Sequence, residues 1–166
     1  PGRVVGDAKI VVGVEMLFSG PIGEHGDWFL AARVGLCVPG VLFECAPSDG
    51  LVVEVLERGA AVRAMHDPTR GGVVTVCHEV SDRSGARVTL IEDDLPVRRE
   101  VAGVCDLLGL DPLALACEGR MLVWVAGDQA QLLLDVMRAH PRGEGAAIIG
   151  TMKELEAGTP PVVMNN

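Results

Sequence analysis

Short segments rich in Val and Ile alternate with segments whose apolar residues recur at helical spacing, and this alternation constrains the fold more than any other feature. The strand-like segments end near Gly or Pro, and they cover residues 9–19, 61–65, 87–91, 121–126 and 146–150. The helix-like segments have apolar residues three or four positions apart, and they include residues 27–36, 51–56, 73–80, 97–108 and 132–137. Such alternation favours an α/β (α+β) fold, in which a layered mixed sheet is covered by helices.

Local signals mark several ends of these helices. Gly85 and Gly109 each follow an apolar stripe, as expected of the residue just past a helix. The pair Asp111-Pro112 is typical of a helix start, with Asp as the N-cap and Pro at the first helical position.

Composition is that of a globular protein and excludes some partners. Of the 166 residues, 49% are hydrophobic and 22% are charged, which is enough apolar material for one domain with a core. The net charge of −9 repels nucleic acid and anionic membranes, and no Lys/Arg cluster reverses it locally. No apolar run is long enough to span a bilayer. We therefore expect neither a nucleic-acid partner nor a membrane partner.

The cysteines point to a reducing compartment. The sequence has five, namely Cys37, Cys45, Cys77, Cys105 and Cys117, and none forms a C-x-x-C pair. An odd number without this spacing argues against a disulfide framework and against a tetrahedral zinc site. We expect buried thiols in a cytoplasmic protein, and we assign no metal ligands.

The segment from residue 66 to residue 72 lies between a predicted strand and a predicted helix. Its paired glycines let the backbone approach a ligand, and the start of a helix offers unpaired N–H groups at a positive dipole end. Arg70 is able to add a bidentate donor, and Asp67 is able to hold the loop or to lie near a metal–phosphate complex. The candidate nucleotide- or anion-binding residues are Asp67, Thr69, Arg70, Gly71 and Gly72. The alternative is an ordinary strand-to-helix turn with Thr69 as its N-cap.

Two other turns carry side chains suited to proton transfer. Glu118 precedes a glycine between a short helix and a strand, where it could act in a cleft as a general acid or base; the alternative is a surface carboxylate. The neighbouring Cys117 is either a reactive thiol or a buried, inert one. His25 stands in a glycine-rich loop and is a candidate proton carrier, unless that loop is a plain connection.

Four segments, taken in order, resemble motifs of the HypE family of hydrogenase maturation proteins. This family belongs to the superfamily that includes aminoimidazole ribonucleotide synthetase and selenophosphate synthetase. Residues 19–26 resemble S-G-x-x-G-[DE]-H-G, residues 65–73 resemble M-x-D-P-T-R-G-G, residues 107–120 resemble L-L-G-L-D-P-L followed by A-[NC]-E-G-[KR], and residues 137–150 resemble the last helix and strand. The resemblance covers residues 9–152. Selenophosphate synthetase fits less well, because it predicts a different glycine-rich loop and no Leu-Gly-Leu-Asp-Pro run.

The resemblance implies a fold similar to the carboxy-terminal domain of aminoimidazole ribonucleotide synthetase. HypE proteins use ATP to dehydrate a thiocarboxamide on their own terminal cysteine to a thiocyanate, which supplies the cyanide ligand of [NiFe] hydrogenases. Their amino-terminal domain provides most of the ATP site, and the carboxy-terminal domain completes the cleft. By the same resemblance, Glu118 would transfer protons and His25 would lie near the cleft, which would be lined by Asp67, Arg70, Gly71 and Gly72.

These expectations extend to domains and partners. We expect residues 1–152 to form the HypE-like domain and residues 153–166 to form a poorly ordered tail. Because no ATP domain precedes residue 9 and the tail lacks the terminal cysteine, full activity and the binding of ATP and Mg²⁺ are expected only with a partner amino-terminal domain. Expected partners are a second copy of the chain, that domain, and other hydrogenase maturation proteins. The alternative is a stand-alone binding or dimerisation module without catalysis.

Overall fold

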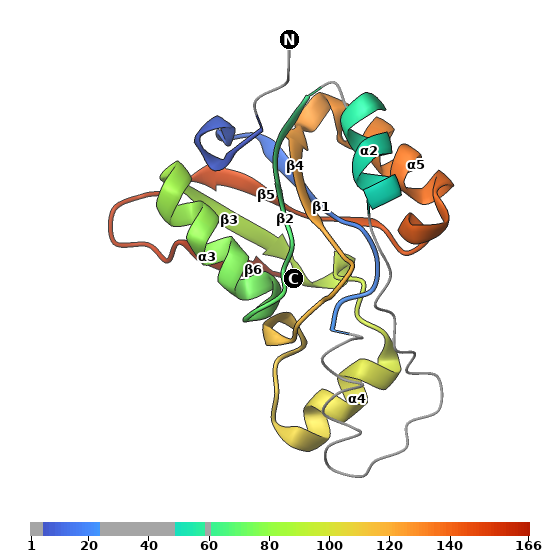
Figure 1. Cartoon of the computed structure of the whole chain (residues 1–166). Coiled ribbons are helices and arrows are strands. Elements are labelled where there is room, and N and C mark those ends of the chain that lie inside the picture. Colours follow the sequence, from blue (N-terminus) through green and yellow to red (C-terminus); the bar gives the residue numbers. More distant parts are fainter. Residues whose placement is uncertain (1–4, 24–48, 59–60) are drawn as a thin grey trace.

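A computed structural model describes residues 5–23, 49–58 and 61–166, and it contains a mixed sheet covered by helices (Figure 1). Within these ranges the sheet has six strands in the order β2-β4-β1-β5-β3-β6. The strands are β1 (Val14–Phe18), β2 (Val62–His66), β3 (Ala86–Ile91), β4 (Leu122–Ala126), β5 (Ala147–Glu154) and β6 (Val162–Asn165). Neighbouring strands pair antiparallel except β3 and β6, which are parallel. The predicted fold class is therefore confirmed.

The described helices cover both faces of the sheet. They are α2 (Asp49–Arg58), α3 (Gly72–Ser84), α4 (Arg99–Leu108) and α5 (Ala130–Ala139). Short 3-10 turns join the elements, namely η1 (Asp7–Lys9), η2 (Glu92–Asp94), η3 (Pro112–Ala114), η4 (Gly127–Gln129) and η5 (Pro141–Gly143). The predicted helix at residues 27–36 lies outside the described residues. None of the described helices is long and apolar enough to cross a membrane.

Strand β4 shows why the sheet is covered on both sides. Its side chains alternate between the two faces, as the pleat of a strand requires. Leu122 and Trp124 pack into the core beneath α3, whereas Val123 and Val125 pack into the core beneath α2 and α5. The run Leu-Val-Trp-Val is apolar at every position because neither face of this strand meets water. In Figure 1, α2 and α5 lie side by side, away from α3, and α4 lies beyond one end of the sheet.

The two ends of the chain differ from the sequence-based expectation. Strand β1 begins at Val14 rather than at residue 9, because η1 occupies residues 7–9 and Gly13, with a φ of 85°, redirects the chain. The expected boundary at residue 152 falls inside β5, and the segment expected to be a poorly ordered tail contains β6. The unpaired edge of β3 accounts for this difference, since it supplies the backbone partners that residues 162–165 need.

Glu15, on β1, is a half-buried carboxyl group in the central part of the sheet. Burial raises its pKa, and the hydrogen bond with Thr151 and the charge of Lys153 offset that rise only in part. A carboxyl group with a raised folded-state pKa favours the folded state when it is protonated. Its contribution to stability is therefore lost as the pH rises through the folded pKa.

We predict that Glu15→Gln raises the melting temperature at pH 7 by roughly 1–2 °C, after allowance for solvent screening. The gain should shrink toward zero as the pH falls below the ordinary range of a carboxyl group, because the wild-type side chain is then protonated. Thermal denaturation followed by circular dichroism, at pH 7 and at a pH below the carboxyl range, measures the change in melting temperature. Glu57→Gln, at an exposed position on α2, is the control and should leave the melting temperature unchanged at both pH values. A lower melting temperature for Glu15→Gln at pH 7 would contradict the argument.

Candidate functional site

The candidate site lies where the loops after β1 and β2 meet the segment that leads into β4. Leu122, the first residue of β4, pairs with Phe18 at the end of β1 and with His66 at the end of β2. Because both pairings are antiparallel, residues 19–23, 67–71 and 115–121 must emerge at the same end of the sheet. The sheet register therefore brings together three of the four motifs found in the sequence.

Hydrogen bonds join these loops. The N–H of Ser19 donates to the carbonyl of Met121 at 3.0 Å, and the N–H of Met121 donates back to the Ser19 hydroxyl at 2.9 Å. The N–H of Cys117 donates to the carbonyl of Pro68 at 3.1 Å. The N–H of Gly23 donates to Sγ of Cys117 at 3.2 Å. The segment before β4 is thus held by both of the other loops, and the buried thiol of Cys117 is part of that junction.

Helix α3 starts with two glycines that allow close packing. Gly71 is its N-cap, with a φ of 75°, and Gly72 has a φ of 63°. A Cβ on Gly72 would lie 2.3 Å from the carbonyl oxygen of Leu113 and 2.5 Å from that of Leu115. These positions need glycine because the backbone of residues 113–115 passes against the first turn of the helix.

Thr69 does not cap this helix, so the alternative in which Thr69 is the N-cap is wrong. No side chain caps α3 at Gly71. The N–H of Thr69 instead donates to the carbonyl of Asp67 at 3.0 Å, which tightens the loop. Gly71 and Arg70 are exposed beside this uncapped end, whereas Gly72 is buried. An anion at this helix start would therefore meet the exposed Arg70 and Gly71 rather than the buried residues that follow them.

Asp67 and Glu118 are the two carboxylates that the junction brings close. Burial raises the pKa of Asp67, and the negative charge of Glu118 raises it further. Glu118 is half-buried, on the segment whose residue 117 is bonded to Pro68. A carboxyl group whose pKa is raised in this way is suited to proton transfer. Sequence reasoning named both residues, and the structure adds that the charge of Glu118 acts on Asp67.

A hollow of about 190 Å³ adjoins this pair. It is lined by Val52, Met65, His66, Asp67, Arg120 and Met121. Nη1 of Arg120 donates to the carbonyl of Arg142 at 3.2 Å, and a Cβ on Gly20 would lie 2.3 Å from that same atom. The guanidinium is therefore confined between two backbone segments. Arg120 is not among the predicted site residues, and its place next to Gly119 is the local signal that points to it.

A larger hollow of about 340 Å³ lies elsewhere, lined by Glu92, Leu95, Val97, Asp111, Pro112, Leu113 and Met164. Asp67 lines the smaller hollow and not this one, so we place the candidate site at the smaller hollow. His25 lies outside the described residues.

Cys77, Cys105 and Cys117 are buried, and burial raises the pKa of Cys77 to about 12, which makes it inert as a nucleophile. In the part of the chain that the structure describes, no group of three or more His, Cys, Asp or Glu side chains could hold a metal ion.

Comparison with protein families and with solved structures gives consistent results. A family model described as "AIR synthase related protein, C-terminal domain" matches residues 5–160. A putative hydrogenase expression/formation protein of Methanocaldococcus jannaschii is 39% identical over 150 residues, which are 90% of this chain and 45% of that protein. Carbamoyl dehydratase HypE of Escherichia coli is 39% identical over 150 residues, which are 90% of this chain and 44% of that protein. The chain thus spans about half the length of these curated relatives.

Solved structures show the same fold. The crystal structure of Escherichia coli HypE matches with a TM-score of 0.91 and 34% identity, over 98% of this chain and 49% of that one. A chain of a HypE–HypF complex matches with a TM-score of 0.88 and 36% identity, over 97% of this chain and 52% of that one. HypE in complex with ATP matches with a TM-score of 0.86 and 32% identity, over 96% of this chain and 49% of that one.

We predict that Gly72→Ala lowers the free energy of unfolding by roughly 2–5 kcal/mol, because it adds a steric clash to backbone strain. Gly85→Ala is the matched control. Gly85 has a φ of 70°, but a Cβ there meets nothing within 4 Å, so only the strain of about 1–2 kcal/mol applies. Urea denaturation of both variants measures the difference. Equal losses would show that residues 113–115 do not press on Gly72.

Proposed function

The chain belongs to the family of AIR synthase related proteins, as their carboxy-terminal domain, and we propose that it forms the carboxy-terminal half of a HypE-like carbamoyl dehydratase. In this proposal it completes an ATP-dependent site that converts a cysteine-bound thiocarboxamide to a thiocyanate, for the cyanide ligands of [NiFe] hydrogenases. The name carbamoyl dehydratase HypE, printed for a relative that is 39% identical, supports the reaction class.

The observation that carries the proposal is that Asp67 lines the hollow and feels the negative charge of Glu118. Dehydration of a carboxamide to a nitrile group removes two protons from nitrogen and one oxygen from carbon. Glu118 is the residue we assign to accept a proton from nitrogen. Asp67 assists it because its raised pKa favours the protonated form of this carboxyl group, which reduces the repulsion between like charges. His25 remains a proposed proton carrier near the cleft.

The uncapped start of α3 suits a phosphate group. Gly71 is exposed at the positive end of the helix dipole, and Thr69 and Arg70 precede it directly. We assign Asp67, Thr69, Arg70, Gly71 and Gly72 to the nucleotide- or anion-binding side of the site. Bound ATP with Mg²⁺ would supply the phosphoryl group that turns the amide oxygen into a leaving group. A matching HypE structure solved in complex with ATP supports this assignment.

The proposal also covers the partners and the cellular location of the protein. Because relatives are about twice as long as this chain, the missing half of the ATP site would come from an amino-terminal domain. The solved HypE–HypF complex supports other maturation proteins as partners. We propose a cytoplasmic location, a homo-oligomer, and no nucleic-acid or membrane partner for the assembled protein.

One observation favours a second candidate, a binding or dimerisation module without catalysis. Leu107 is 70% exposed, and Leu132 and Val53 are 55% and 52% exposed. Large apolar side chains in water are suited to contacts with another protein surface. A strict monomer in light scattering at high concentration would argue against self-association through these residues.

We predict that ATP with Mg²⁺ binds only when a HypE amino-terminal domain is added to this chain, as measured by calorimetry. In the assembled protein, Glu118→Gln should keep ATP binding and lower dehydratase turnover by about 100-fold or more, as expected for loss of a general acid or base. Glu156→Gln, at an exposed position far along the chain, is the control and should keep full activity.

The outcomes separate the candidates. Full activity in Glu118→Gln would remove Glu118 from the proton-transfer role. Failure to bind ATP with or without the amino-terminal domain would instead favour the module without catalysis.

A further inference from the structure

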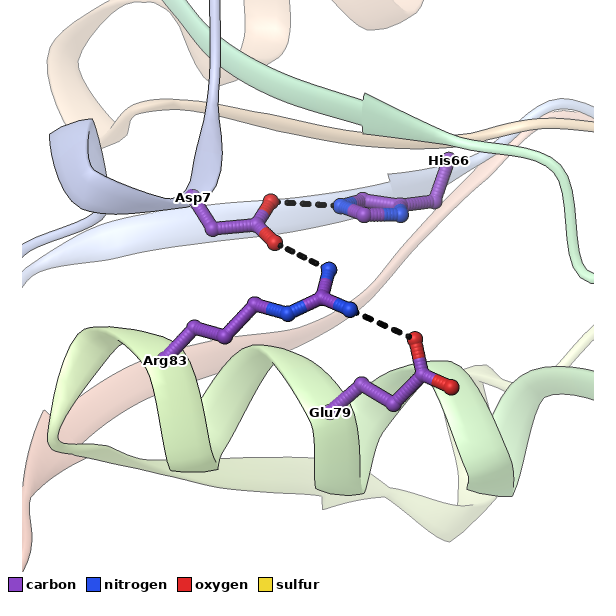
Figure 2. A network of polar contacts seen from close by, with 4 residues as sticks. All are labelled: Asp7, His66, Glu79 and Arg83. Atoms are coloured by element: carbon purple, nitrogen blue, oxygen red, sulfur yellow. Dashed lines mark hydrogen bonds and ion pairs between the residues drawn. The ribbon is translucent and has the colours of Figure 1, made fainter.

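A network of four charged or titratable side chains lies on the α3 side of the sheet, and of its members His66 alone lines the hollow of the candidate site (Figure 2). Asp7 is at its centre. One carboxylate oxygen accepts a hydrogen bond from Nε2 of His66 at 2.6 Å, and the other accepts one from Nη1 of Arg83 at 2.8 Å. Arg83 also reaches Glu79 at 3.5 Å, one turn earlier in α3. The network joins η1, the end of β2 and α3.

The contacts of this network differ in strength. The side chains of Asp7 and His66 are 13% and 20% exposed, whereas those of Arg83 and Glu79 are 56% and 50% exposed. Exposed ion pairs contribute little because water and salt screen them, but a short, largely buried hydrogen bond to a carboxylate is stronger. The Asp7–His66 hydrogen bond is therefore the principal contact of the network. Glu79 adds only an exposed contact with Arg83.

The Asp7 carboxylate is held in its charged form. Burial alone would raise its pKa, but the hydrogen bonds and positive charges of Arg83 and His66 outweigh burial and lower it. The ring of His66 is also fixed from a second direction, because Trp124 meets it nearly edge-on, with ring centres 5.4 Å apart. His66 thus has a defined position in the fold, which a surface histidine would lack.

The position of His66 in the sheet determines what this restraint affects. Strand β2 is an edge strand that pairs with β4 on one side, and on its other side the N–H of Gly6 donates to the carbonyl of Arg63 at 2.8 Å. His66 is the last residue of β2, and Asp67 follows it directly. The end of an edge strand has fewer restraints than a central strand. A side chain anchored at its last residue therefore sets the direction in which the next residue leaves.

We propose that Asp7 and His66 are positioning residues for the candidate site, because their hydrogen bond fixes the end of β2 and so places the Asp67 carboxylate beside Glu118. The inference rests on the proposed function only in treating Asp67 as a site residue. It assigns a role to η1, which contributes nothing to the hollow itself. The interaction between Asp67 and Glu118 depends on their separation, so a loop that shifts outward weakens it.

Two measurements on this chain, without ATP or a partner, test the placement. The first is the titration of the Asp67 carboxyl carbon by NMR; Glu118 is the charged group that acts on it, and His66 and Arg120 line the same hollow. The second is hydrogen exchange at the Cys117 amide, which reports the hydrogen bond between the two loops. In Asp7→Ala and His66→Leu, the pKa of Asp67 should fall toward the ordinary carboxyl range, and the Cys117 amide should exchange about tenfold faster.

Two control variants separate positioning from simple stability. His66→Gln keeps a donor for Asp7 and should restore both values. Glu79→Ala removes only the outer, exposed contact and should change neither by a measurable amount. A purely structural role for Asp7 and His66 would lower the melting temperature while leaving the Asp67 titration in the folded protein as in the wild type, and that result would overturn the proposal.

The test does not depend on a single variant. If His66→Leu fails to fold, Asp7→Ala carries the test, because Asp7 lies on a short turn outside the core. The outcome is also independent of the proposed dehydratase activity. Loss of activity in Glu118→Gln with an unchanged Asp67 titration in Asp7→Ala would retain the function and reject the positioning role.

Discussion

The antiparallel pairing of Leu122 with both Phe18 and His66 is the constraint on which the site depends. It brings the ends of β1 and β2 against the start of β4, so three loops from distant parts of the sequence meet without any ligand. The close approach of Gly72 to the carbonyls of Leu113 and Leu115 then sets how closely residues 113–115 pack against the start of α3. The candidate carboxylates lie on loops, and strand β4, at which these loops meet, is buried on both faces.

Elements governed by local rules could be predicted from the sequence. Helix α3 ends with Gly85 in the left-handed conformation, as its apolar stripe and glycine predict. Asp111 caps η3 through a hydrogen bond of 2.8 Å from the N–H of Leu113, followed by Pro112 at the first position. Strand β4 is recognisable because a strand buried on both faces is apolar throughout. The ordered motifs also led to the family, and the comparisons confirmed it.

Features that depend on contacts between distant segments could not be predicted. Strand β6 has no periodic pattern of its own, and it exists because β3 offers an unpaired edge. Thr69 is a good N-cap by residue type, yet the helix starts two residues later, where only glycine fits against residues 113–115. The Arg120 guanidinium lies against Gly20, which is a hundred positions away in the sequence. The charge of Glu118 acts on Asp67, which is some fifty positions away. No local rule connects such residues.

The two carboxylates on either side of the end of β2 make opposite contributions. The pKa of Asp7 is lowered, so it adds stability that is present at neutral pH and lost as the pH falls through its folded pKa. The pKa of Asp67 is raised, so its contribution is lost as the pH rises through its own folded pKa. The ionised form of Asp7 therefore stabilises the fold, whereas the ionised form of Asp67 carries a cost. Such a cost has no structural benefit, which is why the pair of Asp67 and Glu118 is better explained by chemistry than by stability.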